Sequence, residues 1–421
     1  MIVLARHFII FIAVALLSYW LPRLYDTLLF ERSTNPSVNY SVVENDFYIG
    51  SKYEKTMHYQ SATTGEFFLW KDMQEKLPLR AYRQLQLEKR LPKQVNGIPI
   101  SVAEIEAWRK RFKYDPRWQD APDYSIFQLF ESNGEHATLQ ATDQLIRIAN
   151  GINVYRTETN EILEQASIQI QQAFDDEGFK FPAKLAMHNS KSNKLYEEGL
   201  YAIDQQGHLF HGRIFNGDFI IHNLTQLADG YSFDQRLADL DVAFLQVDEF
   251  NRGNIRALII DTSNQLYLLK APGYQLLPLP IGDFDYTRDR FNLSFNPVYM
   301  ELTVYRDEKR DKYIINHQGK LLNQYSQTLQ DQSTHWSQQL KTWLFPFELS
   351  LSDSKHVLAN PELIAFSSQV LMVHLLLLIL ITIWRIHKRQ AVMSGDLLWV
   401  AATGVFGLIA LLMIPRKNNS L

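Results

Sequence analysis

Three long apolar runs at the two ends of the chain constrain its fold more than any other feature of the sequence. The first covers residues 8–22, or about twenty residues when counted back to Ile2, and the others cover residues 363–384 and 397–414. A helix that crosses a bilayer needs about 20 mostly apolar residues. The sequence therefore predicts one N-terminal and two C-terminal transmembrane helices, the last two forming a hairpin.

The first run could also be a secretory signal peptide, since both have a positive start and an apolar middle. Bulky Tyr19 and Trp20 stand where a cleavage site would need small residues, and both suit a membrane–water interface. We therefore expect an uncleaved anchor, with a removed signal as the alternative.

Basic residues beside the runs predict the orientation of the chain. Arg6 precedes the first run, and Arg385, Lys388 and Arg389 follow the second. Because basic residues favour the cytoplasmic side, the N-terminus and the turn between the last two helices are expected there. The expected organisation is an anchor at 1–25, a domain outside the inner membrane at 26–358, and a helical hairpin at 359–421. Arg416 and Lys417 would then have to cross the membrane, so the side of the C-terminus stays open.

The domain between the apolar runs reads mainly as β-strand, and one hairpin pattern recurs in it. Two or three apolar residues are followed by Asp or Asn, a short turn with Gly or Asn, and apolar residues again. The clear copies begin their turns at Asp204, Asp261 and Asn316, and weaker copies lie at residues 58–68 and 154–163. Hairpins that recur at about 50 residues suggest a propeller-like array of about five or six blades. A β-sandwich with regular hairpins is the alternative.

A helical insertion is expected at residues 73–118. Leu77, Leu85 and Leu91 lie on roughly one face of a helix over residues 77–91. Ser101 and Glu104 form the sequence pattern of a capping box, which places the start of a second helix there.

Two further stretches have polar or aromatic residues in positions that suggest contacts. Trp336, Leu340 and Trp343 form a helical stripe, which either lies in the interface plane of the membrane or packs as the last core helix. His374 lies near the middle of the second apolar run. Its side chain is expected either to bond a neighbouring helix or to contact another membrane subunit.

Composition excludes several classes of function. The chain has no cysteine, which excludes disulfides, thiolate catalysis and sulfur-ligated metals. The net charge of −4 gives no electrostatic signature of nucleic-acid binding. Phosphate-binding loops and hydrolase motifs are missing, and neither the histidines at 208, 211 and 222 nor the acidic stretch 283–289 has metal-ligand spacing. The sequence thus predicts no catalytic residue, no cofactor and no metal.

The segments 77–85, 91–99 and 127–132 resemble a family of uncharacterised bacterial envelope proteins that share a domain of unknown function and terminal membrane helices. The residues that match its motif are Tyr82, Arg83, Gln84, Asn96 and Gly97. Members are often encoded beside the ATPase and permease of an ABC transporter. The resemblance implies a role accessory to transport and attaches no reaction to these five residues, for which a structural role is expected.

These observations favour a non-catalytic, membrane-anchored scaffold in the bacterial inner membrane, with its large domain in the periplasm and an ABC-type permease and ATPase as partners. The alternative is an envelope enzyme or a carbohydrate- or peptide-binding protein that uses the propeller funnel. A funnel lined by carboxylates or histidines with perturbed pKa values would favour that alternative. A sensor that signals through its helices is a third hypothesis.

Overall fold

The computed structural model of the chain divides into two compact units. One comprises Pro36–Thr328, and the other comprises Met1–Asn35 together with Leu329–Leu421. The predicted domain at 26–358 extends past the first unit on both sides. The structure describes residues 2–29, 35–53, 56–119, 125–133, 139, 142–191, 194, 196–226, 234–250, 252–306, 308–329, 336–351, 362–365, 368–387 and 394–414.

Besides a two-stranded sheet within the predicted insertion, the described residues of the unit Pro36–Thr328 form five antiparallel sheets of three to five strands, most of them simple meanders. Their strands are β1 Ser37–Ser41, β2 Asp46–Tyr53, β3 Thr56–Ser61 and β4 Phe67–Leu69; β8 Ile126–Phe127, β9 Gln144–Ile148 and β10 Ile152–Arg156; β11 Leu185–His188, β12 Leu200–Ile203, β13 Leu209–Phe215 and β14 Asp218–Asn223; β15 Val242–Phe250, β16 Ile255–Asp261, β17 Leu266–Lys270 and β18 Gln275–Pro278; and β7 Arg111–Tyr114 with β19 Arg290–Phe295, β20 Met300–Tyr305, β21 Lys309–Ile315 and β22 Leu321–Thr328. The prediction of a mainly β domain is confirmed.

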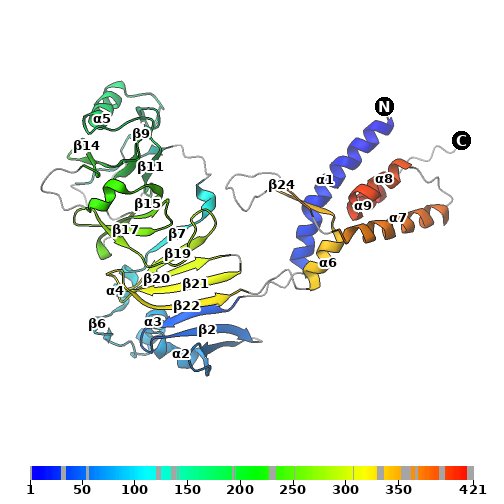
Figure 1. Ribbon diagram of the computed structural model, residues 1–421, viewed down its shortest axis with the longest axis horizontal. Coiled ribbons are helices and arrows are strands. Elements are labelled where there is room, and N and C mark those ends of the chain that lie inside the picture. The colour runs from blue at the N-terminus through cyan, green and yellow to red at the C-terminus, as the bar shows by residue number, and fades with distance from the viewer. Residues whose placement is uncertain are drawn as a thin grey trace. The chain divides into compact units, whose positions relative to one another are not determined.

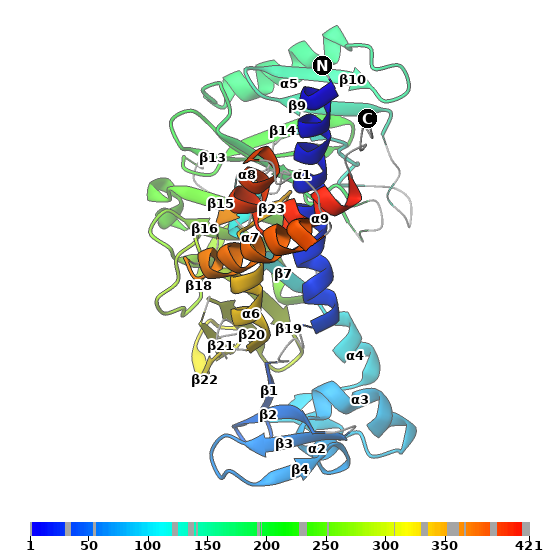
Figure 2. The same cartoon turned by 90° about the vertical axis from the view of Figure 1, so that its right-hand side faces the viewer.

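Hydrophobic clusters between neighbouring sheets show the order in which the sheets pack. One cluster lies between β8–β10 and β11–β14, the next between β11–β14 and β15–β18, and a third between β15–β18 and β19–β22. A fourth joins β19–β22 to β1–β4 through Tyr299 and Tyr40. Figures 1 and 2 show β9 at one end of this row and β2 at the other. None of the clusters of described residues joins these two end sheets into a ring.

The three clear copies of the predicted turn have the same local structure. Oδ1 of Asp204, Asp261 or Asn316 accepts hydrogen bonds from the backbone N–H groups two and four residues later. The fourth residue of each turn has φ between 70° and 96°, which Gly and Asn tolerate best. These turns join β12 to β13, β16 to β17, and β21 to β22. The predicted hairpins are therefore confirmed.

The predicted insertion is only partly helical. It contains two short strands, and its β7 pairs with β19, so that Arg111 lies opposite Ser294. Ser101 caps a short helix by accepting from the Glu104 N–H, but the Glu104 carboxylate accepts from Trp108 Nε1 instead of closing the capping box. The insertion contains the end of α2 Trp70–Lys76, then α3 Pro78–Leu87, β5 Gln94–Val95, β6 Ile98–Pro99, α4 Val102–Ala107 and the 3-10 turn Pro116–Trp118, besides β7. Outside the insertion, the same unit has α5 Glu164–Asp176 and the 3-10 turns Gln235–Asp239 and Arg252–Asn254.

The second unit consists mostly of apolar helices. Two described helices, over Leu4–Leu29 and Val370–His387, are long and apolar enough to cross a membrane. The expected third span is instead divided at Gly404, whose φ is 53°. A Cβ at Gly404 would lie 2.2 Å from Nε2 of His374, so the close approach of this histidine requires glycine. The elements are α1 Ile2–Leu29, α6 Trp336–Leu344, β23 Phe347–Ser350, β24 Glu362–Ala365, α7 Val370–His387, α8 Ser394–Thr403 and α9 Val405–Met413.

Candidate functional site

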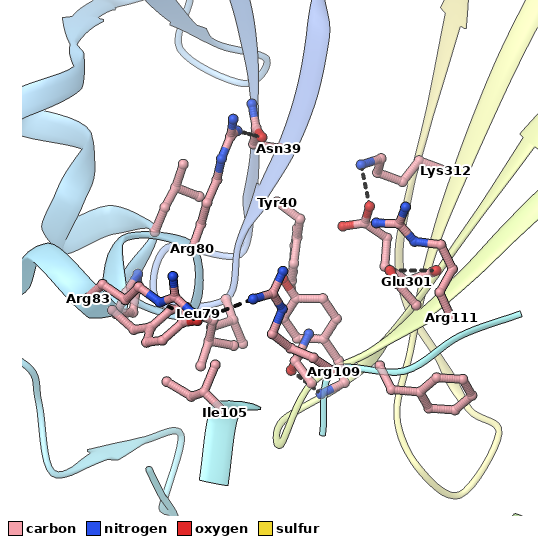
Figure 3. A pocket seen from close by; sticks show the side chains of 18 residues that line it. Asn39, Tyr40, Leu79, Arg80, Arg83, Ile105, Arg109, Arg111, Glu301 and Lys312 are labelled. Atoms are coloured by element: carbon pink, nitrogen blue, oxygen red, sulfur yellow. Dashed lines mark hydrogen bonds and ion pairs between the residues drawn. The ribbon is translucent and has the colours of Figure 1, made fainter. Parts of the chain in front are cut away.

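A pocket lined by basic side chains lies between α3 and the sheet that contains β7. Its volume is about 550 Å³. Arg80 and Arg83 come from the exposed face of α3, whose buried face packs Ala81 and Leu85 into the protein. Figure 3 shows Arg111 and Lys312 on the opposite wall and Arg109 between the two walls. We call this cavity the arginine pocket; its polar lining is Asn39, Tyr40, Arg80, Tyr82, Arg83, Arg109, Arg111, Ser294, Asn296, Tyr299, Glu301 and Lys312.

Two of the five cations in the arginine pocket have carboxylate partners. Arg83 Nη2 lies 2.8 Å from Glu106 Oε1, and Lys312 Nζ lies 2.6 Å from Glu301 Oε1. Lys312 also donates to the Val38 carbonyl at 2.7 Å, which fixes its position. The hydrogen bond from Arg83 lowers the pKa of the Glu106 carboxyl. The Glu106 carboxylate is therefore ionised at neutral pH.

The other three cations are Arg80, Arg109 and Arg111. Arg80 donates to the Asn39 side-chain oxygen, and Arg109 Nη1 lies 3.4 Å from the Tyr82 hydroxyl. Both of these partners are neutral. Among the residues that the structure describes, none of the three arginines forms an ion pair with a carboxylate. The pocket thus has an excess of positive charge, although the whole chain has a net charge of −4.

The residues that resemble the family motif divide between this pocket and its surroundings. Tyr82 and Arg83 line the arginine pocket, and the Arg83 Nε lies 3.1 Å from the Tyr82 hydroxyl. Gln84 points elsewhere and donates to Glu88. Asn96 and Gly97 both have positive φ in the turn between β5 and β6, and Asn96 also donates to the Val42 carbonyl. The contacts of Gln84 and Asn96 and the turn conformation of Asn96 and Gly97 therefore fit structural roles.

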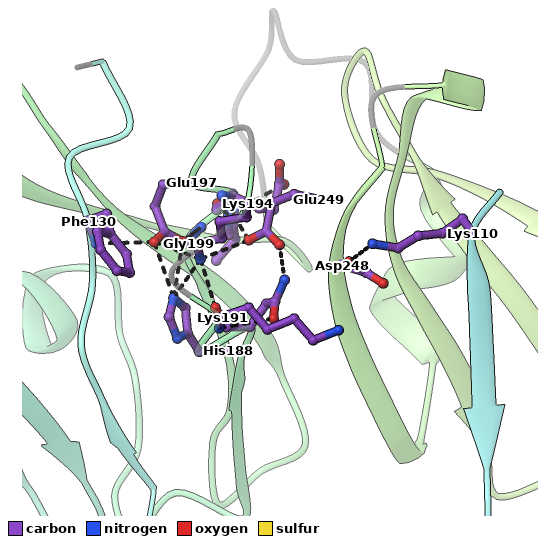
Figure 4. Close-up of polar contacts among 12 residues, drawn as sticks. Lys110, Phe130, His188, Lys191, Lys194, Glu197, Gly199, Asp248 and Glu249 are labelled. Atoms are coloured by element: carbon purple, nitrogen blue, oxygen red, sulfur yellow. Dashed lines mark hydrogen bonds and ion pairs between the residues drawn. The ribbon is translucent and has the colours of Figure 1, made fainter. Parts of the chain in front are cut away.

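A second cluster of charges lies between the sheets β11–β14 and β15–β18. Lys194 Nζ lies 2.9 Å from Glu197, 3.0 Å from Glu249 and 2.8 Å from the Asn189 carbonyl, so its three donors have three acceptors. Figure 4 shows this lysine between the two carboxylates. His188 Nε2 contacts Glu197 at 3.1 Å. The side chains of Glu197, Glu249 and His188 have no exposed surface.

Burial and pairing act in opposite directions on Glu197. Burial alone would raise its pKa, but the hydrogen bonds and charges of His188 and Lys194 hold the pKa below its ordinary value. The carboxylate also accepts from the backbone N–H groups of Phe130 and Gly199. Glu197 is therefore an ionised structural anchor for several loops rather than a free acid or base.

Glu198 and His211 form an adjacent buried group with Arg256. Burial raises the pKa of Glu198 despite its ion pair with Arg256. His211 stacks on Tyr201, its Nδ1 lies 2.7 Å from the Tyr274 hydroxyl, and its Nε2 lies 2.7 Å from the Glu198 carbonyl. Burial lowers the pKa of His211 to about 3, so the ring is neutral at physiological pH.

These two groups have the residue types of an acid–base site, but their charged atoms already have partners within the chain. A cavity of about 880 Å³ is lined by Lys194 and Glu249 together with Lys110 and Asp248, which also bind one another. Their charged atoms are bound to groups of this chain. No cluster of three metal-ligating side chains occurs among the described residues. The arrangement supports a structural role better than catalysis.

In the helical unit, the ends of three helices meet at one carboxylate. Arg6 Nη1 lies 2.6 Å from Asp396 Oδ1, and Arg385 Nη2 lies 2.7 Å from Asp396 Oδ2. His374 Nδ1 lies 3.0 Å from the Ala401 carbonyl, while its Nε2 is buried with no hydrogen-bond partner among the described residues. A contact of His374 with another subunit stays a prediction. The role of Asp396 was not predicted from the sequence. The feature that could have indicated it is a single acidic residue directly before the third apolar run, while Arg6 and Arg385 flank the other two runs.

Comparisons with known proteins give a family but no activity. No curated protein matches the chain. The structure titled "Structure of Dos1 propeller" is 10% identical, covers 80% of this chain and 74% of its own, and has a TM-score of 0.26. The allergen Mala s 1 of Malassezia sympodialis is 10% identical, with 79% and 93% covered and a TM-score of 0.24. A family model described as a domain of unknown function, DUF4857, matches residues 37–315. The chain therefore belongs to the DUF4857 family.

Proposed function

We propose that this protein is a non-catalytic, membrane-anchored scaffold that holds its β-rich unit in the periplasm, next to an ABC-type transporter of the inner membrane. The observation that carries the membrane anchoring is the spacing of two ionic clusters on α1. Arg6 binds Asp396 near one end, and Asp26 binds Lys341 at 2.6 Å near the other. At the helical rise of roughly 1.5 Å per residue the clusters are about 30 Å apart, the thickness of the hydrocarbon core.

The surface of the helices between these clusters suits lipid or another apolar subunit. On α1 the large side chains at positions 8, 11, 16 and 20 are exposed, and on α7 those at 372, 375, 379 and 383 are exposed. Apolar faces of this extent are rare on soluble monomers and mark contact with membrane or protein. Both α1 and α7 meet the length requirement for a span.

The short helix α6 presents its apolar side outward and its polar side inward. Trp336 and Trp343 are 60% and 49% exposed, whereas Ser337 and Lys341 are buried. Tyr25 of α1 donates to the Ser337 carbonyl at 2.7 Å. A tryptophan stripe beside a polar cluster at a helix end is typical of the membrane–water interface. This supports the interfacial reading of the stripe.

Charge and connectivity support the proposed orientation. Arg6 and Arg385 share Asp396, so the start of α1 and the end of α7 lie on one side, which the positive-inside tendency makes cytoplasmic. The chain enters and leaves the β-rich unit from the end of α1 and the start of α6. That unit then lies on the periplasmic side. The broken segment α8–α9 packs into the helical unit and leaves the side of the C-terminus open.

The test of the partner is purification of the tagged full chain from native membranes in a mild non-ionic detergent. The proposal expects a permease and an ATPase in stoichiometric amounts. The test variant is Ile379→Arg, which changes the exposed face of α7. Its control is Leu87→Arg, at an exposed position of the β-rich unit. Recovery of the wild type as a lone monomer would contradict the transporter partnership, while leaving the membrane anchoring to its own test.

A further inference from the structure

We propose that the arginine pocket binds a small phosphorylated anion. The proposal is independent of the transporter partnership, because it rests on the described residues of Pro36–Thr328 alone. The pocket's volume of about 550 Å³ falls in the range of small-molecule sites.

The charges of the pocket are arranged for a ligand rather than for one another. Arg83 and Lys312 have carboxylate partners, and Arg80 and Arg109 donate to neutral side chains. None of Arg80, Arg109 and Arg111 forms an ion pair with a carboxylate among the described residues. Like charges that share a cavity repel, which costs stability as long as no counter-charge is present. A negatively charged phosphoryl group bound between these side chains offsets the repulsion.

The positions of the guanidiniums suit a phosphoryl group. Arg80 comes from α3, Arg111 begins β7 on the facing wall, and Arg109 lies between them (Figure 3). Guanidinium groups match phosphate oxygens with two parallel hydrogen bonds, and several from different directions surround a tetrahedral anion. Tyr82, which is 6% exposed and lies 3.2 Å from Glu106, fixes the base of this arrangement.

The neighbouring ion pairs hold the walls without neutralising the centre. Glu106 binds Arg83 and Tyr82, and Glu301 binds Lys312, so each carboxylate is occupied at the edge of the pocket. Ser294, opposite Arg111 in the strand pair, donates to the Glu301 carbonyl. Such supporting contacts pre-organise a binding site, because the cations need not be ordered when the ligand arrives.

The experiment is calorimetric titration of the full chain, in non-ionic detergent, with inorganic pyrophosphate. The variants are Arg111→Gln and the double variant Arg109→Gln/Arg111→Gln. Arg147→Gln is the matched control, since Arg147 is an exposed arginine on another sheet outside the pocket. A charge-assisted contact contributes enough that its loss weakens binding roughly tenfold or more. We expect saturable binding by wild type and control, a tenfold loss in the single variant, and a greater loss in the double variant.

A second arm separates a free phosphate from a lipid headgroup. Mixed micelles with phosphatidylglycerol replace pyrophosphate, and phosphatidylcholine micelles give the background. Arginine-dependent binding in either arm supports the proposal and identifies the source of the phosphoryl group. Thermal unfolding of each variant shows whether it folds. Because the substitution removes one of several like charges, we expect Arg111→Gln to melt no lower than wild type. The proposal is overturned if neither probe binds, or if wild type, Arg111→Gln and Arg147→Gln bind equally.

Discussion

Arg6 and Asp396, which are nearly the whole chain apart in sequence, form an ion pair of 2.6 Å, and Arg385 binds the other carboxylate oxygen at 2.7 Å. One buried carboxylate therefore joins α1, α7 and α8. Removing the charge of Asp396 would take away the counter-ion that Arg6 and Arg385 share, and an uncompensated buried charge is costly.

We expect Asp396→Asn to destabilise the helical unit by roughly 3 kcal/mol or more, which is the usual cost of breaking a buried pair. Thermal unfolding in detergent, followed by light scattering and circular dichroism, measures the loss. Asp143→Asn is the control, because Asp143 pairs with Arg156 at 3.5 Å on the surface and such pairs contribute about 1 kcal/mol or less. Equal effects of the two substitutions would show that the Asp396 cluster does not hold the helices.

The burial of His211 predicts a pH dependence of stability. Its pKa is lowered to about 3 in the folded protein, against 6.5 for the ordinary ring. Below pH about 6.5 the unfolded chain takes up a proton that the folded chain does not, so stability falls as the pH falls, by roughly 1.4 kcal/mol per pH unit, until the pH reaches about 3.

A His211→Gln variant is therefore expected to lose part of this acid slope, even if its stability at pH 7 is lower. Melting temperatures from pH 7 to pH 4 measure the slope. His208→Gln is the control, since His208 lies in the nearby turn and is partly exposed. The explanation fails if the slope of His211→Gln equals that of wild type.

The shared turn structure predicts which substitutions Asp261 tolerates. Its Oδ1 accepts from the Ser263 and Gln265 N–H groups, as Asn316 does in the equivalent turn. Asp261→Asn keeps this acceptor and is expected to change stability little. Asp261→Ala leaves the donors without it and is expected to cost about 1–3 kcal/mol. Denaturant unfolding of both variants checks the difference, and a loss of similar size in both would contradict the role of the side-chain oxygen.

The exposed stripe of α6 predicts contact with lipid. In bilayers with brominated acyl chains, Trp336→Phe is expected to lower the quenched fraction of tryptophan fluorescence. Trp118→Phe, at an exposed position of the β-rich unit, is expected to raise it, because the lost fluorophore is not quenched. A rise in both variants would place α6 away from the acyl chains.

Local interactions explain what the sequence alone could predict. The turns at Asp204, Asp261 and Asn316 depend on hydrogen bonds over two to four residues, and the Ser101 cap spans three. The apolar runs of α1 and α7 are likewise continuous in sequence. Patterns of this kind are readable because the interacting residues are neighbours along the chain.

Contacts between distant segments account for what the sequence did not reveal. β7 joins a sheet whose other strands begin at Arg290, and Glu249 meets Lys194 through the packing of two sheets. The need for glycine at position 404 depends on the close approach of His374 from another helix. In the arginine pocket, the resemblance singled out Tyr82 and Arg83, but Arg111 and Lys312 join them only through strand pairing.

The proposed topology requires the β-rich unit and the Arg6–Asp396 end of the helices to lie on opposite sides of the membrane. Because the chain has no cysteine, single cysteines at exposed positions report their side without background. The two variants are Asp176→Cys at the end of α5 and Ser394→Cys at the start of α8. With a membrane-impermeant maleimide applied to cells whose outer membrane alone is permeabilised, we expect labelling of Asp176→Cys and protection of Ser394→Cys until lysis. Protection of Asp176→Cys, or labelling of both before lysis, would contradict it.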